Sequence, residues 1–183
     1  MTTLSTPLPT THARLSVDVC LEVAHLLAET LRAEPPQFRQ FAMPSDRSNL
    51  PLGGYLLGYG YAKPHQVVRA LRTQEQALPG ETRMLIGEIL VHHDVISPRV
   101  LATMLAIQLV DRLIDPQPFQ PNRIGEHLVS RGLIQPRQLA GALQLQTWLR
   151  RKGMPIQLGE LLVHQGLVGK HHLAEVLNHA KSA

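Results

Sequence analysis

The sequence is poor in cysteine and in aromatic residues. Its single cysteine, Cys20, cannot form an internal disulfide, and its place in the apolar pattern VDVCLEVAHLL predicts a small buried side chain rather than a nucleophile. Only 4% of the 183 residues are aromatic, too few to build the base-stacking surface of a single-strand nucleic-acid binder. The one tryptophan, Trp148, is therefore expected to anchor a core or an interface.

Long apolar runs are also missing. The opening residues, MTTLSTPLPTTHAR, hold no apolar segment after a basic one, and no run of about 18 apolar residues occurs anywhere. Neither a signal peptide nor a membrane span is supported, so we expect a cytoplasmic protein whose residues 1–14 form a disordered tail. Eighteen basic against fourteen acidic residues give a net charge of +4, which favours anionic partners without naming one.

Signatures of catalysis and of metal binding are absent. The chain has no G-x-x-x-x-G-K-[ST] loop, no G-x-S-x-G elbow and no constellation of paired carboxylates. Two of its histidine pairs are adjacent, but neighbouring residues on a helix point in different directions, and no H-x-x-x-H or CxxC spacing accompanies them. We therefore expect no enzyme, no cofactor and no metal site.

What the chain does contain is one unit of about 23 residues in four copies. The copies align without a gap and begin at Leu52, Ile86, Ile124 and Leu158. They read LGGYLLGYGYAKPHQVVRALRTQ, IGEILVHHDVISPRVLATMLAIQ, IGEHLVSRGLIQPRQLAGALQLQ and LGELLVHQGLVGKHHLAEVLNHA. Because the starts are equally spaced within the first two and the last two copies, the sequence indicates a two-unit domain duplicated in tandem.

Each unit predicts two short helices. The ninth position suits a left-handed cap that ends the first helix, and it is occupied by Gly60, Asp94, Gly132 and Gly166. A proline at the thirteenth position of three copies suits the first turn of the second helix, and Ser97 precedes one of them as an N-cap. The following LxxALxxQ pattern places apolar residues on one helix face.

These patterns predict an all-α fold of tandem helix-turn-helix repeats. One unit cannot cover its own apolar face, but two units can do so as a small four-helix bundle, so we expect two such bundles plus an N-terminal helix. The helix is expected from Leu15 to Arg32. The predicted organisation is an N-terminal helix and linker over 15–50, a first repeat pair over 51–114, a Pro-rich linker over 115–122 and a second repeat pair over 123–180.

The shared pattern (R)-[LI]-G-x-x-L-[LV]-x-x-G-[LVY]-[IVA]-x-x-x-x-L-x-x-A-L-x-x-Q resembles the MshEN-type domain of type II secretion and type IV pilus assembly ATPases and of some glycosyltransferases. The resemblance covers residues 51–180, here without the ATPase. It implies that two consecutive copies bind cyclic di-GMP through the Arg, the Gly, the apolar positions and the final Gln. Only the third copy carries the Arg, as Arg123, and the fourth copy ends in Ala180 instead of Gln.

The residue types suit that ligand. A glycine lets a ligand approach the main chain closely, and guanine accepts a bidentate Arg while its faces pack on apolar side chains. The implied cyclic di-GMP site lies in the second repeat pair. Its candidate residues are Arg123, Ile124, Gly125, Leu128, Leu139, Leu143, Gln146, Gln157, Leu158, Gly159, Leu162, Leu173 and Leu177, with Arg150 and Arg151 as candidate phosphate contacts.

Two recurring polar positions have a structural explanation beside the functional one. Glutamate stands near the start of three units, where a carboxylate complements the helix dipole, at Glu88, Glu126 and Glu160. The terminal glutamine of three units fits either a shared packing contact or a ligand contact, and its positions are Gln74, Gln108 and Gln146.

The sequence raises three candidate functions. The first is a bacterial cyclic di-GMP receptor or adaptor that regulates a protein partner in a secretion, pilus or polysaccharide machine, with the first repeat pair as a structural or dimerising copy. The second is a ligand-free adaptor that uses the same fold only for protein contacts. Nucleic-acid binding is disfavoured because the second helices are mainly Leu, Ala and Gln with one Arg or His apiece.

Overall fold

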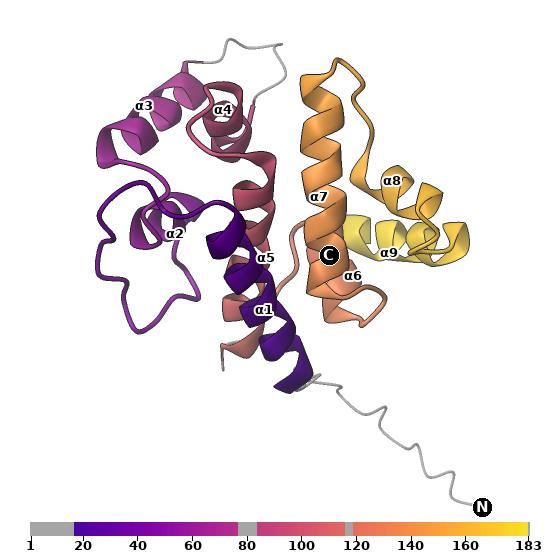
Figure 1. Ribbon diagram of the computed structural model, residues 1–183. Coiled ribbons are helices and arrows are strands. Elements are labelled where there is room, and N and C mark those ends of the chain that lie inside the picture. Colours follow the sequence, from indigo (N-terminus) through magenta and orange to yellow (C-terminus); the bar gives the residue numbers. More distant parts are fainter. Residues whose placement is uncertain (1–16, 77–83, 116–118, 183) are drawn as a thin grey trace, which may run out of the picture.

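The computed structural model describes residues 17–76, 84–115 and 119–182, and every regular element in them is a helix, as predicted (Figure 1). None of these described helices is long and apolar enough to cross a membrane. The predicted tail, residues 1–14, and residues 116–118 of the predicted linker lie outside the described residues. The helices are α1 (Val17–Ala33), α2 (Leu52–Gly58), α3 (Pro64–Glu75), α4 (Ile86–His92), α5 (Pro98–Ile114), α6 (Ile124–Ser130), α7 (Pro136–Arg151), α8 (Leu158–His164) and α9 (Lys170–Ser182).

The predicted turn within each unit is confirmed. A residue with positive φ follows the first helix of all four units, and the angles are 74° at Gly60, 54° at Asp94, 68° at Gly132 and 68° at Gly166. Asp94 is the only non-glycine residue with positive φ in the described part of the chain. The second helices of three units begin at the shared proline, and Ser97 caps α5 by accepting a hydrogen bond from the Val100 N–H at 3.1 Å.

The glycine at the second position of each unit marks a close contact between the two helices of that unit. A Cβ built on Gly125 would lie 2.7 Å from Cδ1 of Leu139, closer than real Cβ atoms approach a neighbour. The other three meet the equivalent side chain of their own unit at 2.5 to 2.9 Å: Gly53 with Val67, Gly87 with Leu101 and Gly159 with Leu173. Helix packing alone therefore explains why this position is glycine.

Each repeat pair has a buried apolar cluster, and the cluster of the second pair also includes Leu109 of α5. The leucine at the fifth position of every unit lies in these clusters and is at most 1% exposed; the four are Leu56, Leu90, Leu128 and Leu162. In the first pair α2 packs against α5 and α3 against α4, and in the second α8 packs against α7 and α9 against α6. The first helix of each unit thus covers the second helix of its neighbour.

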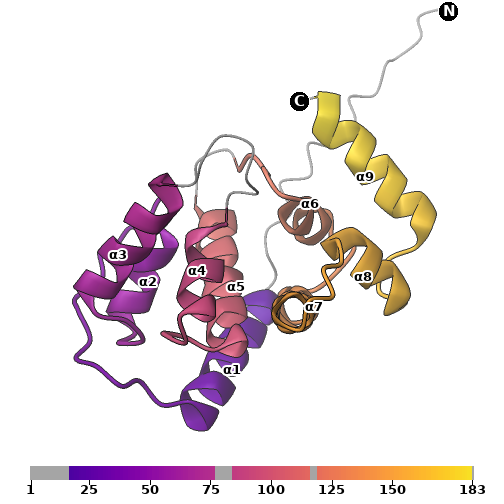
Figure 2. The same cartoon turned by 90° about the horizontal axis from the view of Figure 1, so that it is seen from above.

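The long helices α5 and α7 form the contact between the two repeat pairs (Figures 1 and 2). They run in opposite directions, and α1 packs against both of them. Small buried side chains allow this approach, because Ala102 and Ala106 of α5 cluster with Ala140 of α7 beneath Leu26 of α1. The N-terminal helix is therefore part of the junction between the pairs.

Cys20 is exposed, so the prediction that it is buried is wrong. The side of α1 that faces the core carries Val23 and Thr30, and Thr30 exchanges a 2.8 Å hydrogen bond with Thr103 of α5. Cys20 does not fall on that side. Because apolar residues occur around much of the helix in VDVCLEVAHLL, hydropathy alone does not identify the side that packs.

Candidate functional site

Arg123, the only arginine directly ahead of a unit, is the N-cap residue of α6. Its backbone is extended, with φ −124° and ψ 150°, and its side chain is exposed and makes no cap hydrogen bond. Among the described residues its guanidinium has no partner. Gln157 occupies the same place ahead of α8 and is also exposed. A cation beside the positive end of a helix does not stabilise that helix, so the charge of Arg123 does not contribute to the stability of α6.

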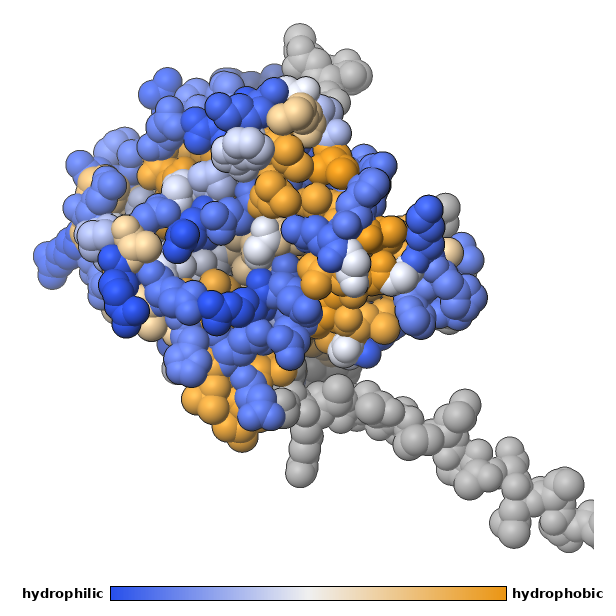
Figure 3. Space-filling view, turned by 45° about the vertical axis from the view of Figure 1, so that its right-hand side comes forward, coloured by the Kyte–Doolittle hydropathy of each residue, from blue (hydrophilic) through white to orange (hydrophobic). Residues whose placement is uncertain are grey.

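The apolar candidates divide into a buried and a surface group. Leu128 and Leu162 are fully buried and Leu139 is 4% exposed, so these three side chains lie in the core. Leu177 is 42% exposed, and the remaining candidates that reach the surface are half-buried: Ile124, Leu143, Leu158, Gly159 and Leu173. Figure 3 shows apolar side chains gathered over the second repeat pair, right of centre on this face.

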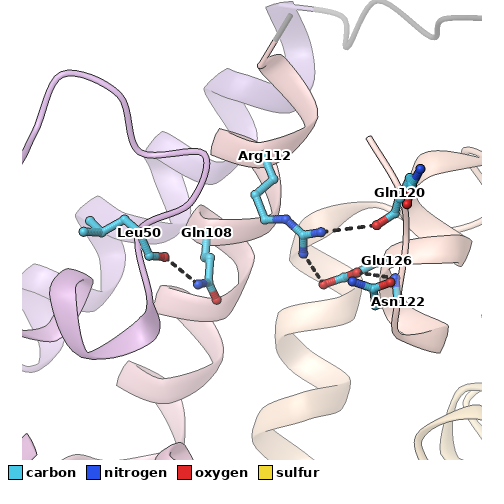
Figure 4. Close-up of polar contacts among 6 residues, drawn as sticks. All are labelled: Leu50, Gln108, Arg112, Gln120, Asn122 and Glu126. Atoms are coloured by element: carbon cyan, nitrogen blue, oxygen red, sulfur yellow. Dashed lines mark hydrogen bonds and ion pairs between the residues drawn. The ribbon is translucent and has the colours of Figure 1, made fainter. Parts of the chain in front are cut away.

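Two of the three terminal glutamines, Gln108 and Gln146, make equivalent contacts inside the fold. Nε2 of Gln146 donates to the carbonyl of Ile156 at 2.8 Å, two residues before α8 begins. Nε2 of Gln108 donates to the carbonyl of Leu50 at 2.8 Å, two residues before α2 begins (Figure 4). In each repeat pair one long helix is thereby tied to the entrance of the neighbouring unit. The sequence left open whether this glutamine serves packing or a ligand, and this contact supplies a packing role.

Arg150 and Arg151, the candidate phosphate contacts, lie against the first repeat pair. Arg150 forms an ion pair with Glu88 at the start of α4, and Nη2 of Arg151 lies 2.7 Å from Oδ1 of Asp94 just beyond the end of α4. The two arginines therefore hold the C-terminal end of α7 across α4. A phosphate would have to compete with both carboxylates for these groups.

The Arg150–Glu88 pair has a counterpart at the other end of the interface. Arg112 occupies the same unit position as Arg150, four residues after the terminal glutamine, and its Nη1 lies 2.7 Å from Oε1 of Glu126. Glu126 in turn occupies the same unit position as Glu88. Figure 4 shows Arg112 reaching from α5 to Glu126 and to the carbonyl of Gln120. Such a reciprocal exchange is the pattern of a two-fold interface.

Both glutamates also cap their helices, in addition to the helix-dipole role predicted for this position. Oε2 of Glu88 accepts a hydrogen bond from the Leu85 N–H at 3.0 Å, and Oε2 of Glu126 accepts one from the Asn122 N–H at 2.8 Å. The sequence predicted the dipole role of these glutamates, but neither the capping hydrogen bonds nor the arginine partners. An arginine four residues after the final glutamine of both inner units is the signal that would have found them.

Tyr55 and Tyr61 of the first repeat pair contact the linker that follows α1, and the Tyr55 hydroxyl lies 3.2 Å from the carbonyl oxygen of Arg47. The Tyr55 hydroxyl donates to Oδ2 of Asp111 at 2.9 Å, and the Tyr61 hydroxyl donates to the carbonyl of Glu34 at 2.9 Å. Burial raises the pKa of Tyr55, Tyr59 and Tyr61, and for Tyr55 the hydrogen bond to Asp111 adds to the effect. The linker thus closes one side of the first pair.

These tyrosines give a prediction for alkaline pH. All three tyrosines of the chain have a raised pKa, so they will ionise above their usual pKa of about 10 while the protein stays folded. The stability that the protonated phenols contribute is complete below about pH 10 and is lost as the pH rises beyond it. Urea unfolding at a series of pH values will show this loss, and Tyr55→Phe will reduce it. An equal loss in wild type and Tyr55→Phe would contradict the assignment.

Two adjoining hollows lie where the repeat pairs meet. The first, of about 480 Å³, is lined in part by Tyr61, Asp94 and Arg151, and the second, of about 500 Å³, by Arg99, Gly141, Gln144, Leu145 and Trp148. Glu34, Ser97 and Pro98 line both. Trp148 is 49% exposed, so it is open to a partner rather than enclosed in a core. Of the candidate ligand and phosphate residues, only Arg151 lines either hollow.

No group of three or more His, Cys, Asp or Glu side chains lies close enough together to hold a metal ion within the ranges that the structure describes.

The candidate residues comprise an exposed Arg123, a half-buried apolar surface on the second repeat pair, and polar groups engaged inside the fold. In comparisons with known proteins, no family model, no curated protein and no solved structure matches the chain.

Proposed function

We propose that the chain is a helical adaptor that joins protein partners through a scaffold of two repeat pairs. The observation that carries the proposal is the use of Gln146 inside the fold, where it bonds the carbonyl of Ile156. Arg150 and Arg151 likewise pair with carboxylates of the first repeat pair. The polar groups that the MshEN resemblance assigns to a ligand thus have internal partners, apart from Arg123 and Gln157.

Surface features also favour protein contacts. Exposed large apolar side chains and half-buried leucines occur on the second repeat pair, and Trp148 lines a hollow at the junction of the pairs. Tryptophan and arginine are the residue types that most often dominate protein interfaces, and Arg99 lines the same hollow. A junction with an exposed tryptophan suits recognition of another polypeptide.

Affinity capture followed by reconstitution tests this function. The full chain will retain a protein from lysate of its source cells, and the purified partner will co-elute with it at a fixed stoichiometry in size-exclusion chromatography. Cyclic di-GMP added at about 100 times the protein concentration will leave that complex unchanged. Failure to reconstitute any complex, or a complex that forms only with the nucleotide, would overturn the ligand-free adaptor.

Arg123 supports a second candidate, a cyclic di-GMP receptor acting on a protein partner. Its guanidinium is exposed and has no partner among the described residues, and it precedes the one unit that retains the whole Arg-Ile-Gly to Gln pattern. An unpaired arginine is available for the bidentate hydrogen bonds that a guanine edge accepts. In this candidate the ligand either binds beside the intact hydrogen bond between Gln146 and Ile156 or takes the place of Ile156 as the partner of Gln146.

Isothermal titration calorimetry distinguishes the second candidate. If cyclic di-GMP binds, Arg123→Ala will weaken it by about tenfold or more, because a charge-assisted bidentate contact contributes more than an ordinary hydrogen bond. Arg131→Ala is the matched control, since Arg131 is an exposed arginine at the other end of α6. No measurable binding to the wild type at high micromolar ligand would eliminate the receptor.

A further inference from the structure

The two-fold relation between the inner units extends beyond the ion pairs. Equivalent residues of the second and third units differ by 38 in number, the distance from Ile86 to Ile124. Arg112–Glu126 and Arg150–Glu88 obey this relation. The surface formed by α5 and α7 therefore has two equivalent halves, related by exchange of the two helices.

Helix α1 occupies one half of this surface. Its Thr30 hydroxyl forms a hydrogen bond with the Thr103 hydroxyl of α5 at 2.8 Å. Nη2 of Arg137 on α7 donates to Oε1 and Oε2 of its Glu29, at 2.7 and 2.8 Å. Leu26 of α1 packs on the alanine cluster between them. A second carboxylate of α1, that of Glu22, lies near Arg137: burial raises its pKa, whereas the charge and a backbone N–H of Arg137 oppose the rise.

The hollow lined by Trp148 is the other half. Two of the positions that line it are equivalent to positions that bond α1, Arg99 to Arg137 and Gly141 to Thr103, and a third, Trp148, is equivalent to the buried Val110. Thr103 and Arg137 bond α1, and Val110 belongs to the buried cluster that contains Val23 of α1. Where α1 covers the first half, the second half is an open space of about 500 Å³.

We propose that this hollow docks an acidic amphipathic helix of a partner protein, in the manner that α1 docks on the equivalent half. The proposal rests on the adaptor function and names the chemistry of its partner. The expected helix carries an apolar face for Leu145 and Trp148 and a carboxylate for Arg99.

Arg99 and Glu34 both line the hollow, so the acidic partner needs a carboxylate that takes the place of Glu34 against Arg99. Arg137 has a carboxylate at 2.7 Å, whereas the contact of its equivalent, Arg99, to Glu34 is 3.7 Å and runs through Nε. Arg99 also lies in the first turn of α5, a 17-residue helix whose N-terminus attracts negative charge. A partner carboxylate placed as Glu29 is placed against Arg137 would supply the stronger contact.

Gly141 supports a close approach of that helix. It lies in the middle of α7, where glycine destabilises a helix relative to alanine, and its backbone does not require positive φ. A Cβ built on it would meet no neighbour within 4 Å, so nothing inside the chain accounts for the missing side chain. A small residue at this point leaves room for a partner helix to pack against α7.

A synthetic peptide with the sequence of α1, Val17–Ala33 with Cys20→Ser, is the probe. It contains no tryptophan, so the emission of Trp148 reports only the protein. Addition of the peptide to the full chain will shift this emission to shorter wavelength and raise the anisotropy of a dye on the peptide. Gly141→Leu will weaken binding by about tenfold, because its side chain enters the hollow without meeting other atoms of the chain.

Two further changes isolate the charge and the location. Arg99→Gln in the protein, or E22Q and E29Q together in the peptide, will weaken binding about threefold to tenfold, most strongly at low salt. Ala174→Leu, which adds a similar side chain to the exposed face of α9, will leave binding unchanged. Circular dichroism of each variant confirms folding.

Equal binding by wild type and Gly141→Leu, or peptide binding that leaves the Trp148 emission unchanged, would overturn the proposal. The adaptor function is judged separately, by the partner recovered in the capture experiment. If that partner binds wild type and Gly141→Leu equally, the chain is an adaptor whose contact lies elsewhere. If it loses about tenfold in affinity with Gly141→Leu and Arg99→Gln, the hollow is the docking site.

Discussion

Replacing Leu128 with alanine will lower the free energy of unfolding by about 3 kcal/mol, a large part of the total for a domain of this size. Leu128 is completely buried and lies in the cluster of the second repeat pair with Leu139 and Leu162. Removing its side chain loses the transfer free energy of three carbon atoms and leaves a cavity between helices that are fixed by many other contacts.

Leu177→Ala is the matched control for this change. It removes the same atoms from a residue of the same repeat pair whose side chain is 42% exposed, so we expect a loss of about 1 kcal/mol or less. Urea denaturation followed by circular dichroism measures both variants. A loss for Leu128→Ala no larger than that of the control would contradict a packing role for the fifth position of the unit.

Reversing one charge of the Arg112–Glu126 ion pair will have the second large effect on stability. Glu126→Arg places a cation against Arg112, removes the carboxylate that caps the Asn122 N–H, and should cost about 2 kcal/mol. The side chains of Arg112 and Glu126 are only 26% and 14% exposed, so solvent screens this repulsion less than it screens a surface pair. Reversal at the Arg150–Glu88 pair should cost less because those side chains are 47% and 22% exposed.

The double variant, Arg112→Glu with Glu126→Arg, tests whether the effect comes from the pair. It will recover much of the loss of stability but not all of it, because an arginine cannot accept the hydrogen bond from Asn122. Thermal and urea unfolding of the four proteins complete the double-mutant cycle. Losses that simply add in the double variant would show that the two residues do not interact.

The helices of the repeat were predictable because their signals are local. The left-handed residue at the ninth position, the proline at the thirteenth and the Ser97 cap each act within a few residues of sequence, and each is confirmed. The buried leucine of the fifth position follows from the same helical period. These features depend on the chain near them and on burial of one helix face.

The contacts between units were not predictable in the same way. Gln146 finds its partner at Ile156, and Arg150 finds its partner 62 residues earlier in the sequence, at Glu88. Hydropathy shows that a helix has a face to bury but not which helix will cover it, and a polar side chain at the edge of that face has several partners within reach. The exposed Cys20 has the same cause, since α1 is apolar on more than one side.

The Arg112–Glu126 and Arg150–Glu88 ion pairs between the second and third units also bear on whether further repeats could be added to the chain. Repeat proteins usually extend by head-to-tail stacking, in which each copy offers a free end to the next. A two-fold contact uses the same surface on both members and leaves no such end. The two repeat pairs therefore form a closed two-fold arrangement rather than the beginning of a solenoid. Further repeats appended to the chain would have to pack on a different surface.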